Sequence, residues 1–172
     1  MDNFLQLAEE RYSVRKFLDK PLRTEDLSKI LEAAKTAPTA KNQQPQKLYV
    51  VQSKEGLEKI DKVTKCRYGA PTVVIVAYDK DNVYVNPWDD SINSGDTDAA
   101  IVTTHMMLEA WDIGVASCWV QWFNVGLTSE EFQLPDNIVP VSLLPLGYPS
   151  PNAEPSPRHT QYKDEDEMVQ FL

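Results

Sequence analysis

Apolar residues recur at helical intervals over several stretches of the chain. Spacings of three and four predict helices over residues 2–11, over residues 25–36, from Ser53 through Val63, from Asp96 or Asp98 through Ile113, and from Thr128 onward. Thr24 and Ser53 carry hydroxyls suited to capping the second and third of these helices. Gly114 ends the fourth and most apolar helix, because glycine readily adopts the left-handed conformation that closes a helix.

Other stretches have the composition of strands and loops. Runs of β-branched and aromatic residues predict strands over residues 47–52, 72–78, 115–123 and 138–146. The second run is apolar on both faces, so we expect this strand at the centre of a sheet with cover on both sides. Residues 36–46 predict a short ordered loop. The polar stretch 79–95, which holds Tyr84 and Trp88, predicts either a lid or a surface excursion.

The sequence changes character after Leu144. Five prolines between Pro145 and Pro157 exclude regular helix and a central strand, and residues 163–167 are strongly acidic. We therefore predict a domain over residues 1–149 and an extended, proline-rich acidic arm over residues 150–172. The apolar end of the arm, residues 168–172, indicates that it wraps a neighbouring subunit instead of lying free in solvent.

Length and charge narrow the class of protein. A chain of 172 residues, 42% hydrophobic and 25% charged, suffices for one core. Its net charge of -9 repels phosphate backbones and anionic lipid, so we expect no nucleic acid and no membrane as partners.

Cys66 and Cys118 lack the spacing of metal or redox motifs and are expected to be core thiols. No apolar run spans a membrane and no leader precedes the first helix, which indicates a cytoplasmic protein.

Basic side chains nevertheless cluster near the N-terminus of this acidic chain. Arg11, Ser13 and Arg15 occupy alternate positions, so in an extended backbone all three point the same way. Two guanidinium groups and a hydroxyl suit a phosphate monoester, whereas on a helix they would be an ordinary solvated basic end. Arg158, stiffened by Pro157, could close the same site from the other end of the chain.

No catalytic triad or metal-ligand cluster stands out, so no side-chain catalyst and no metal are expected. The chain has two histidines. His105 falls beside the apolar stripe of its helix and is expected to pack there. His159 follows Arg158 and either assists phosphate binding or lies exposed on the arm.

The ordered set of motifs resembles the FMN-dependent nitroreductase-like flavoproteins, over nearly the whole chain. The pieces that carry the resemblance are Arg11-Tyr-Ser-Val-Arg-Lys-Phe17, Ala37-Pro-Thr-Ala-Lys-Asn-Gln-Gln-Pro45, Gly69-Ala-Pro71, Asp96-Thr-Asp-Ala-Ala100, Gly114-Val-Ala-Ser-Cys-Trp119 and Leu146-Gly-Tyr-Pro149 with Arg158 beyond. The resemblance implies an α+β nitroreductase-like fold with a central mixed, mostly antiparallel sheet flanked by helices. It also implies a homodimer with FMN at the subunit interface.

The resemblance also implies roles for particular residues. Those expected to hold the phosphate and ribityl end of FMN are Arg11, Ser13, Arg15 and Arg158. Those expected at the flavin ring are Pro38 and Thr39 from the partner chain, Asn42 and Gln44 by hydrogen bonds, and the backbone of Val120, Gln121 and Trp122 near N5. Arg15 is also the candidate cation beside N1 and O2, where it would stabilise the reduced flavin.

The chain departs from the family pattern at three points. Thr39 stands where serine is usual and keeps the hydroxyl, and Gln46 replaces a frequent aromatic residue. The chain is also short for the family, so the extra helices that build a substrate pocket in longer members are expected to be missing. The substrate range therefore does not carry over.

The implied activity is ping-pong transfer of a hydride from NAD(P)H through flavin N5 to a nitroaromatic, a quinone or a similar electrophilic acceptor. The choice between NADH and NADPH stays open because no Rossmann fingerprint is present. Three alternatives remain: a flavin-binding or sequestering protein with little turnover, specialised flavin chemistry such as reductive dehalogenation, and an interaction protein whose arm is the functional surface.

Overall fold

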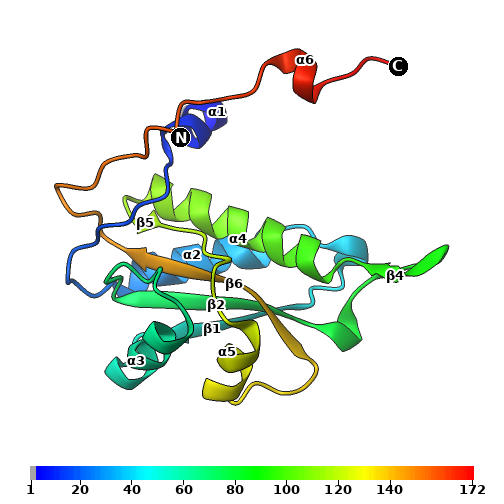
Figure 1. The fold of residues 1–172 in the computed structure, drawn as a ribbon, viewed down its shortest axis with the longest axis horizontal. Helices are drawn as coiled ribbons and strands as arrows, with labels where there is room; N and C mark the ends of the chain where they lie inside the picture. The colour runs from blue at the N-terminus through cyan, green and yellow to red at the C-terminus, as the bar shows by residue number, and fades with distance from the viewer. Residues whose placement is uncertain (1–2) are drawn as a thin grey trace.

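A four-stranded antiparallel sheet in the order β1-β2-β6-β5 organises the molecule (Figure 1). The computed structural model describes residues 3–172. The strands of this sheet are β1 (Gln46–Val51), β2 (Thr72–Asp79), β6 (Ile138–Gly147) and the short β5 (Ala116–Ser117). Strand β1 is one edge of the sheet, and β2 and β6 form its centre.

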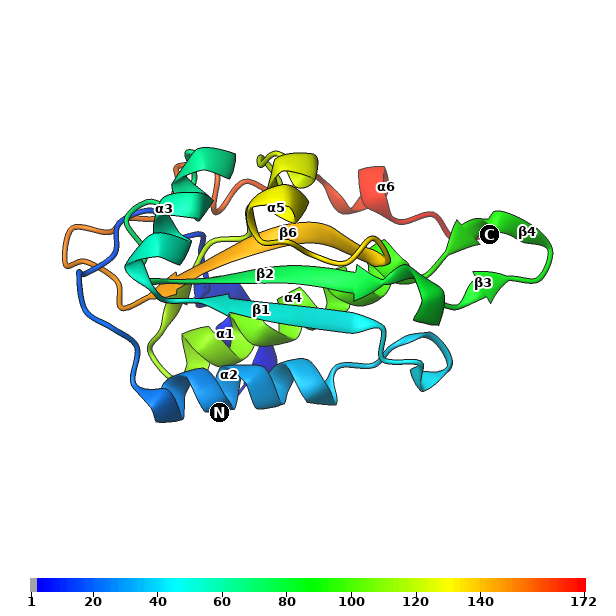
Figure 2. The same ribbon diagram turned by 90° about the horizontal axis from the view of Figure 1, so that it is seen from below.

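Helices cover both faces of the sheet (Figure 2). The helices are α1 (Phe4–Glu10), α2 (Thr24–Thr36), α3 (Lys54–Val63), α4 (Gly95–Asp112), α5 (Val125–Glu131) and α6 (Glu165–Met168), with short 3-10 turns η1 (Ala40–Asn42) and η2 (Lys80–Asn82). Helices α2 and α4 lie on one face of the sheet, and α3 and α5 lie on the other (Figure 2). This three-layer α+β arrangement is the predicted fold class.

Strand β2 supplies side chains to both helical layers. Val74 and Val76 pack in the core beneath α2 and α4, whereas Val73 and Ile75 pack in the core beneath α3 and α5. All four side chains are fully buried, because successive residues of a strand point to opposite faces and each face is covered here. The prediction of a central strand with cover on both sides is confirmed.

The predicted strand over residues 115–123 is wrong in length. Only Ala116 and Ser117 form the strand, and Val120 rejoins β6 through an isolated bridge to Leu143. The interruption lies opposite Pro145, whose carbonyl accepts the N–H of Cys118 at 3.2 Å. Proline has no N–H to return the second bond of the ladder, so the pairing cannot continue there.

The expectation that the prolines after Leu144 exclude a central strand is wrong at Pro145, which lies in β6, and the arm, expected to be extended, contains the short helix α6. The remaining predicted helices and strands agree with the structure to within a few residues. Ser53 caps α3 by accepting the N–H of Gly56 at 3.0 Å, and Gly114 has a φ of 77° just beyond α4. The predicted cap at Thr24 is wrong, because Thr24 is the first residue of α2 and Arg23 precedes it without a capping bond. Residue 2, where the first helix was predicted to begin, lies outside the described residues.

Two segments lie outside the three layers. The stretch 79–95 forms η2 and a hairpin of β3 (Val85–Asn86) and β4 (Asp89–Asn93), which projects from one end of the sheet (Figure 1). Trp88 at its turn is 91% exposed. No helix among residues 3–172 has the length and apolar character needed to cross a membrane.

The first part of the arm after β6 folds back along the N-terminal segment of the chain that follows α1. The N–H of Ser150 donates to the carbonyl of Lys16 at 3.0 Å, and the hydroxyl of Tyr12 donates to the carbonyl of Ala153 at 3.2 Å. From Thr160 onward every residue is exposed, including Phe171 and its apolar neighbours. Only this last part of the arm is free of the body.

Candidate functional site

The segment after α1 is extended and presents alternate side chains to opposite sides. Arg11 closes α1 with extended backbone angles. Val14 is fully buried, and its N–H donates to the carbonyl of Ser117 in β5 at 3.0 Å. Because Val14 points into the core, Ser13 and Arg15 on either side of it point outward. Helix α1 therefore ends before the basic residues, and the reading of a solvated helix end does not apply.

These outward side chains form one cavity with the arm. Its volume is about 380 Å³, and its lining is Arg11, Tyr12, Ser13, Arg15, Ser156, Arg158 and His159. The structure thus brings together the four residues predicted from the two ends of the chain to hold a phosphate. We call this cavity the arginine cavity.

The three arginines of this cavity lack carboxylate partners. Among residues 3–172, no ion pair involves Arg11, Arg15 or Arg158. The nearest partner of Arg15 is the carbonyl of Ser13, at 3.5 Å from its Nη1. Unpaired guanidinium groups gathered around one hollow, in a chain of net charge -9, make a local positive site that suits a dianion.

Tyr12 and His159 hold the two walls of the arginine cavity together. Their rings meet edge to face with centroids 6.0 Å apart, and Tyr12 also lies edge to face against Trp111 of α4 at 5.2 Å. His159 is half-buried and lines the arginine cavity, so of the two alternatives stated for it, exposure on the arm is wrong. Tyr12 was missed from the sequence, although it stands within the basic motif.

The thiol of Cys118 is buried and free. Burial raises the pKa of the Cys118 thiol, and the Arg15 guanidinium only partly opposes this effect. Both cysteines are buried and free, as expected for core thiols. No cluster of metal-ligating side chains occurs among residues 3–172. The arrangement can bind and orient an anion.

The residues predicted at the flavin ring do not line the arginine cavity. Pro38, Thr39, Asn42 and Gln44 lie in the loop between α2 and β1, at the end of the sheet where the hairpin projects (Figures 1 and 2). Within this loop Gln44 donates its N–H to Oγ1 of Thr39 at 3.1 Å and its side-chain amide to Oδ1 of Asn42 at 3.0 Å. The two predicted amide side chains therefore bond to each other.

The backbone of this loop is strained. Lys41, Asn42 and Gln44 have φ values of 52°, 55° and 51°. Each non-glycine residue in this left-handed region costs about 1–2 kcal/mol. Such strain persists only where surrounding contacts over-determine the conformation, and it is enriched at functional sites.

The third predicted group follows β5. Val120 is buried and bridged to Leu143, whereas Gln121 is exposed beside Asp96 of α4. Trp122 is 78% exposed, and its carbonyl accepts the hydroxyl of Thr64 at 2.7 Å. Thr64, which sequence reasoning missed, thus fixes the backbone that was expected near flavin N5.

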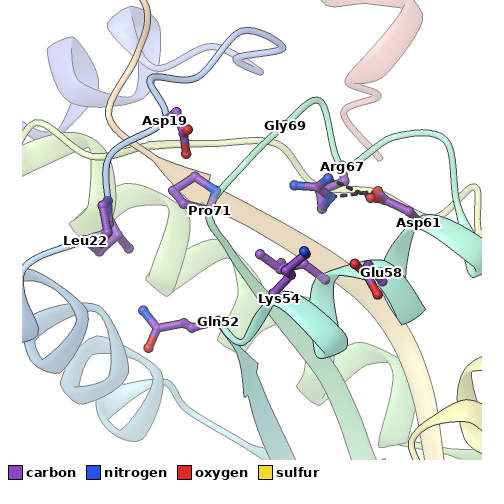
Figure 3. Close-up of a pocket in the computed structure, with 11 residues that line it drawn as sticks. Asp19, Leu22, Gln52, Lys54, Glu58, Asp61, Arg67, Gly69 and Pro71 are labelled. Atoms are coloured by element: carbon purple, nitrogen blue, oxygen red, sulfur yellow. Dashed lines mark hydrogen bonds and ion pairs between the residues drawn. The ribbon is translucent and has the colours of Figure 1, made fainter.

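A larger cavity of about 620 Å³ lies between the segment after Phe17 and helix α3 (Figure 3). Its arginine, Arg67, donates two hydrogen bonds to Asp61 at 2.7 and 2.6 Å and a third to the carbonyl of Ala70 at 3.0 Å. The guanidinium is neutralised, and among the other charged residues of the lining the two acids Asp19 and Glu58 outnumber the one base, Lys54. The cavity contains none of the predicted cofactor residues and is unsuited to a dianion.

Comparison with known proteins agrees with the fold and the motif order. A model of the nitroreductase family matches residues 8–68 and 65–148. The crystal structure of a nitroreductase family protein from Clostridium difficile 630 is 43% identical, with a TM-score of 0.92 over 98% of each chain. A relative from Archaeoglobus fulgidus, whose name includes NAD(P)H nitroreductase, is 31% identical over 87% of each chain.

A further solved structure carries a cofactor in its name. The FMN-dependent nitroreductase of Clostridium difficile R20291 is 25% identical to this chain, with a TM-score of 0.77 over 98% of each chain. The two proteins therefore share the three-layer arrangement over almost their whole length.

Proposed function

Because this chain belongs to the nitroreductase family, we propose that it is an FMN-dependent oxidoreductase that uses NAD(P)H to reduce a small electrophilic acceptor. The observation that carries the proposal is the arginine cavity, where three arginines without carboxylate partners and one serine hydroxyl converge from both ends of the chain. A phosphate monoester is the ligand that such a set fits best, because guanidinium pairs bidentately with phosphate oxygens.

In this proposal the side chains of the cavity bind and orient the cofactor. Arg11, Ser13, Arg15 and Arg158 hold its phosphate and the adjoining ribityl chain, and Arg15 also provides positive charge toward the ring. FMN supplies the redox chemistry when bound, since its ring takes up a hydride from NAD(P)H and passes two electrons to an acceptor. No side-chain acid or nucleophile is then required.

We further propose that the active form is a homodimer. Pro38, Thr39, Asn42 and Gln44 lie away from the arginine cavity of their own chain, so a second copy is needed to bring them to the ring (Figure 2). Large apolar side chains stand exposed on one protomer, among them Trp88, Trp122 and Phe171. Their burial between two copies and under the free end of the arm would contribute the hydrophobic free energy of association.

The experiment begins with the visible spectrum of the protein after addition of FMN and removal of unbound flavin. We expect flavin absorption to remain, and to bleach when NADH or NADPH is added without oxygen. A nitroaromatic or a quinone should then restore the colour. Protein that stays colourless contradicts the cofactor assignment, and yellow protein that oxidises NAD(P)H no faster than free FMN supports the sequestering alternative.

The dimer is tested separately by light scattering across a range of concentrations. A mass near twice that of the chain is expected for the full protein, and deletion of residues 161–172 is expected to shift the equilibrium toward monomer. A full-length protein that remains monomeric while turning over NAD(P)H contradicts the shared site.

A further inference from the structure

We propose that Asp98 is a positioning residue, which holds the segment Thr39–Gln44 in the conformation that the flavin ring requires. This inference rests on the proposed function for the role of the segment at the ring. The hydrogen bond between Asp98 and this segment is formed within one chain and does not depend on the proposed function.

Asp98 lies in the first turn of α4 and is 2% exposed. Its Oδ1 accepts the backbone N–H of Ala40 at 2.9 Å, and its Oδ2 accepts the hydroxyl of Ser94 at 2.7 Å. Both carboxylate oxygens are therefore used, one of them on the segment. A buried carboxylate with two well-formed hydrogen bonds is a rigid anchor, because losing either bond leaves a charged oxygen without a partner.

The bond to Ala40 ties the segment to the rest of the fold by a hydrogen bond. Among the described residues, every other hydrogen bond of residues 39–44 joins two members of the segment itself. The strained backbone at Lys41, Asn42 and Gln44 needs an external constraint to persist. The carboxylate of Asp98 supplies it.

The hydroxyl of Ser94 does not perform the usual task of a helix cap. Ser94 precedes α4 but caps no helix N–H with its side chain. Its Oγ donates to Asp98 and accepts the N–H of Tyr84 at 3.1 Å instead. Lys41 in turn places its ammonium 4.9 Å from the centre of the Tyr84 ring. The network thus joins the segment, α4 and the base of the hairpin into one unit.

Stabilisation of α4 alone is the competing explanation, because an acid in the first turn interacts favourably with the helix dipole. The two explanations differ in what an asparagine does at this position. Asparagine has no charge for the dipole, yet its carbonyl can still accept the N–H of Ala40. A positioning role is therefore rescued by Asp98→Asn, and a dipole role is not.

The test compares Asp98→Ala, Asp98→Asn and Ser94→Ala with Asp26→Ala as the matched control. Asp26 is also 2% exposed and accepts two side-chain donors, but it lies at the opposite end of α2 from the segment. In holoprotein we expect Asp98→Ala to change the visible circular dichroism of bound FMN and to weaken FMN binding about tenfold. Ser94→Ala should show a smaller change in the same direction, and Asp98→Asn should remain close to the parent protein.

A measurement that does not require bound flavin distinguishes failure of this inference from failure of the proposed function. Hydrogen exchange of the Ala40 amide should accelerate at least tenfold in Asp98→Ala and stay slow in Asp26→Ala, whether or not FMN binds. Unchanged exchange and an unchanged flavin spectrum in Asp98→Ala overturn the inference. Should Asp98→Ala fail to fold, the same comparison is made with Ser94→Ala. Failure of the parent protein to bind FMN ends the proposed function, while the exchange data still decide whether Asp98 holds the segment.

Discussion

The ring of His159 lies edge to face against the ring of Tyr12, with 6.0 Å between centroids and 61° between planes. One residue belongs to the proline-rich arm and the other to the segment that follows the first helix. Arg158, the neighbour of His159 in the chain, lines the arginine cavity together with Arg11, the neighbour of Tyr12. The positive site therefore exists only when the two ends of the chain meet.

We expect His159→Ala to weaken FMN binding about threefold to tenfold, because an edge-to-face aromatic pair contributes about 0.5–1.5 kcal/mol. The loss acts on the docking of the arm and leaves the three arginines of the cavity in the chain. Fluorescence titration of FMN measures the Kd. Tyr162→Ala, at an exposed position of the same arm, is the control and should leave the Kd unchanged. Equal effects of the two variants would contradict the role given to the ring contact.

Arg158→Ala should weaken FMN binding by at least tenfold and leave riboflavin binding unchanged. A charge-assisted hydrogen bond to phosphate contributes about 1.5–3 kcal/mol. Riboflavin has no phosphate, so the substitution removes no such bond from its complex. The measurement is a pair of titrations, one with each flavin. Lys163→Ala removes a positive charge from the arm outside the cavity, where Lys163 pairs with Glu167 at 3.4 Å. A loss of FMN affinity as large in this control would show that only overall charge matters.

Asp26→Asn should lower thermal stability at neutral pH, and the difference from the parent protein should shrink below about pH 4. The Arg23 guanidinium and the Tyr148 hydroxyl hold the pKa of the buried Asp26 carboxyl below its usual value. A carboxyl with a depressed pKa stabilises the fold above the pKa of the unfolded chain, and this contribution is lost as the pH falls through the folded value.

Calorimetry or circular dichroism follows the melting temperature of this variant, with an expected loss of about 3–6 °C at pH 7. Asp136→Asn, at an exposed position, should stay within about 2 °C of the parent protein. A difference for Asp26→Asn that persists unchanged at pH 3 would contradict the assignment to a depressed pKa.

Iodoacetamide at pH 8 should leave both thiols of the folded protein unmodified over a time that modifies them fully after unfolding. Cys66 and Cys118 are buried, and burial raises the pKa of the Cys118 thiol, so little reactive thiolate is present. Mass spectrometry counts the modified thiols before and after addition of guanidinium chloride. Rapid labelling of Cys118 in the folded protein would mean that the segment over β5 opens readily.

The helices and the central strand could be predicted from the sequence because their signals are local. A run of residues that is apolar on both faces predicted a strand with cover on both sides over residues 72–78, and Ser53 predicted the start of α3. The strand after Gly114 was overestimated because its pairing depends on Pro145, which lies on another strand. Hydrophobic content alone does not reveal a missing donor across a ladder.

The basic motif and its partner Arg158 were identified from the sequence alone, since charge clustered against the net charge of a chain is visible without a structure. The roles of Tyr12 and Asp98 were not. Each acts through a contact with a segment that is distant in the sequence, and the residues next to it in the sequence do not indicate that contact. The sequence by itself determined which elements form and which residues carry the charge. Only the tertiary structure decided which of them meet, because the path of the chain between them sets every long-range distance.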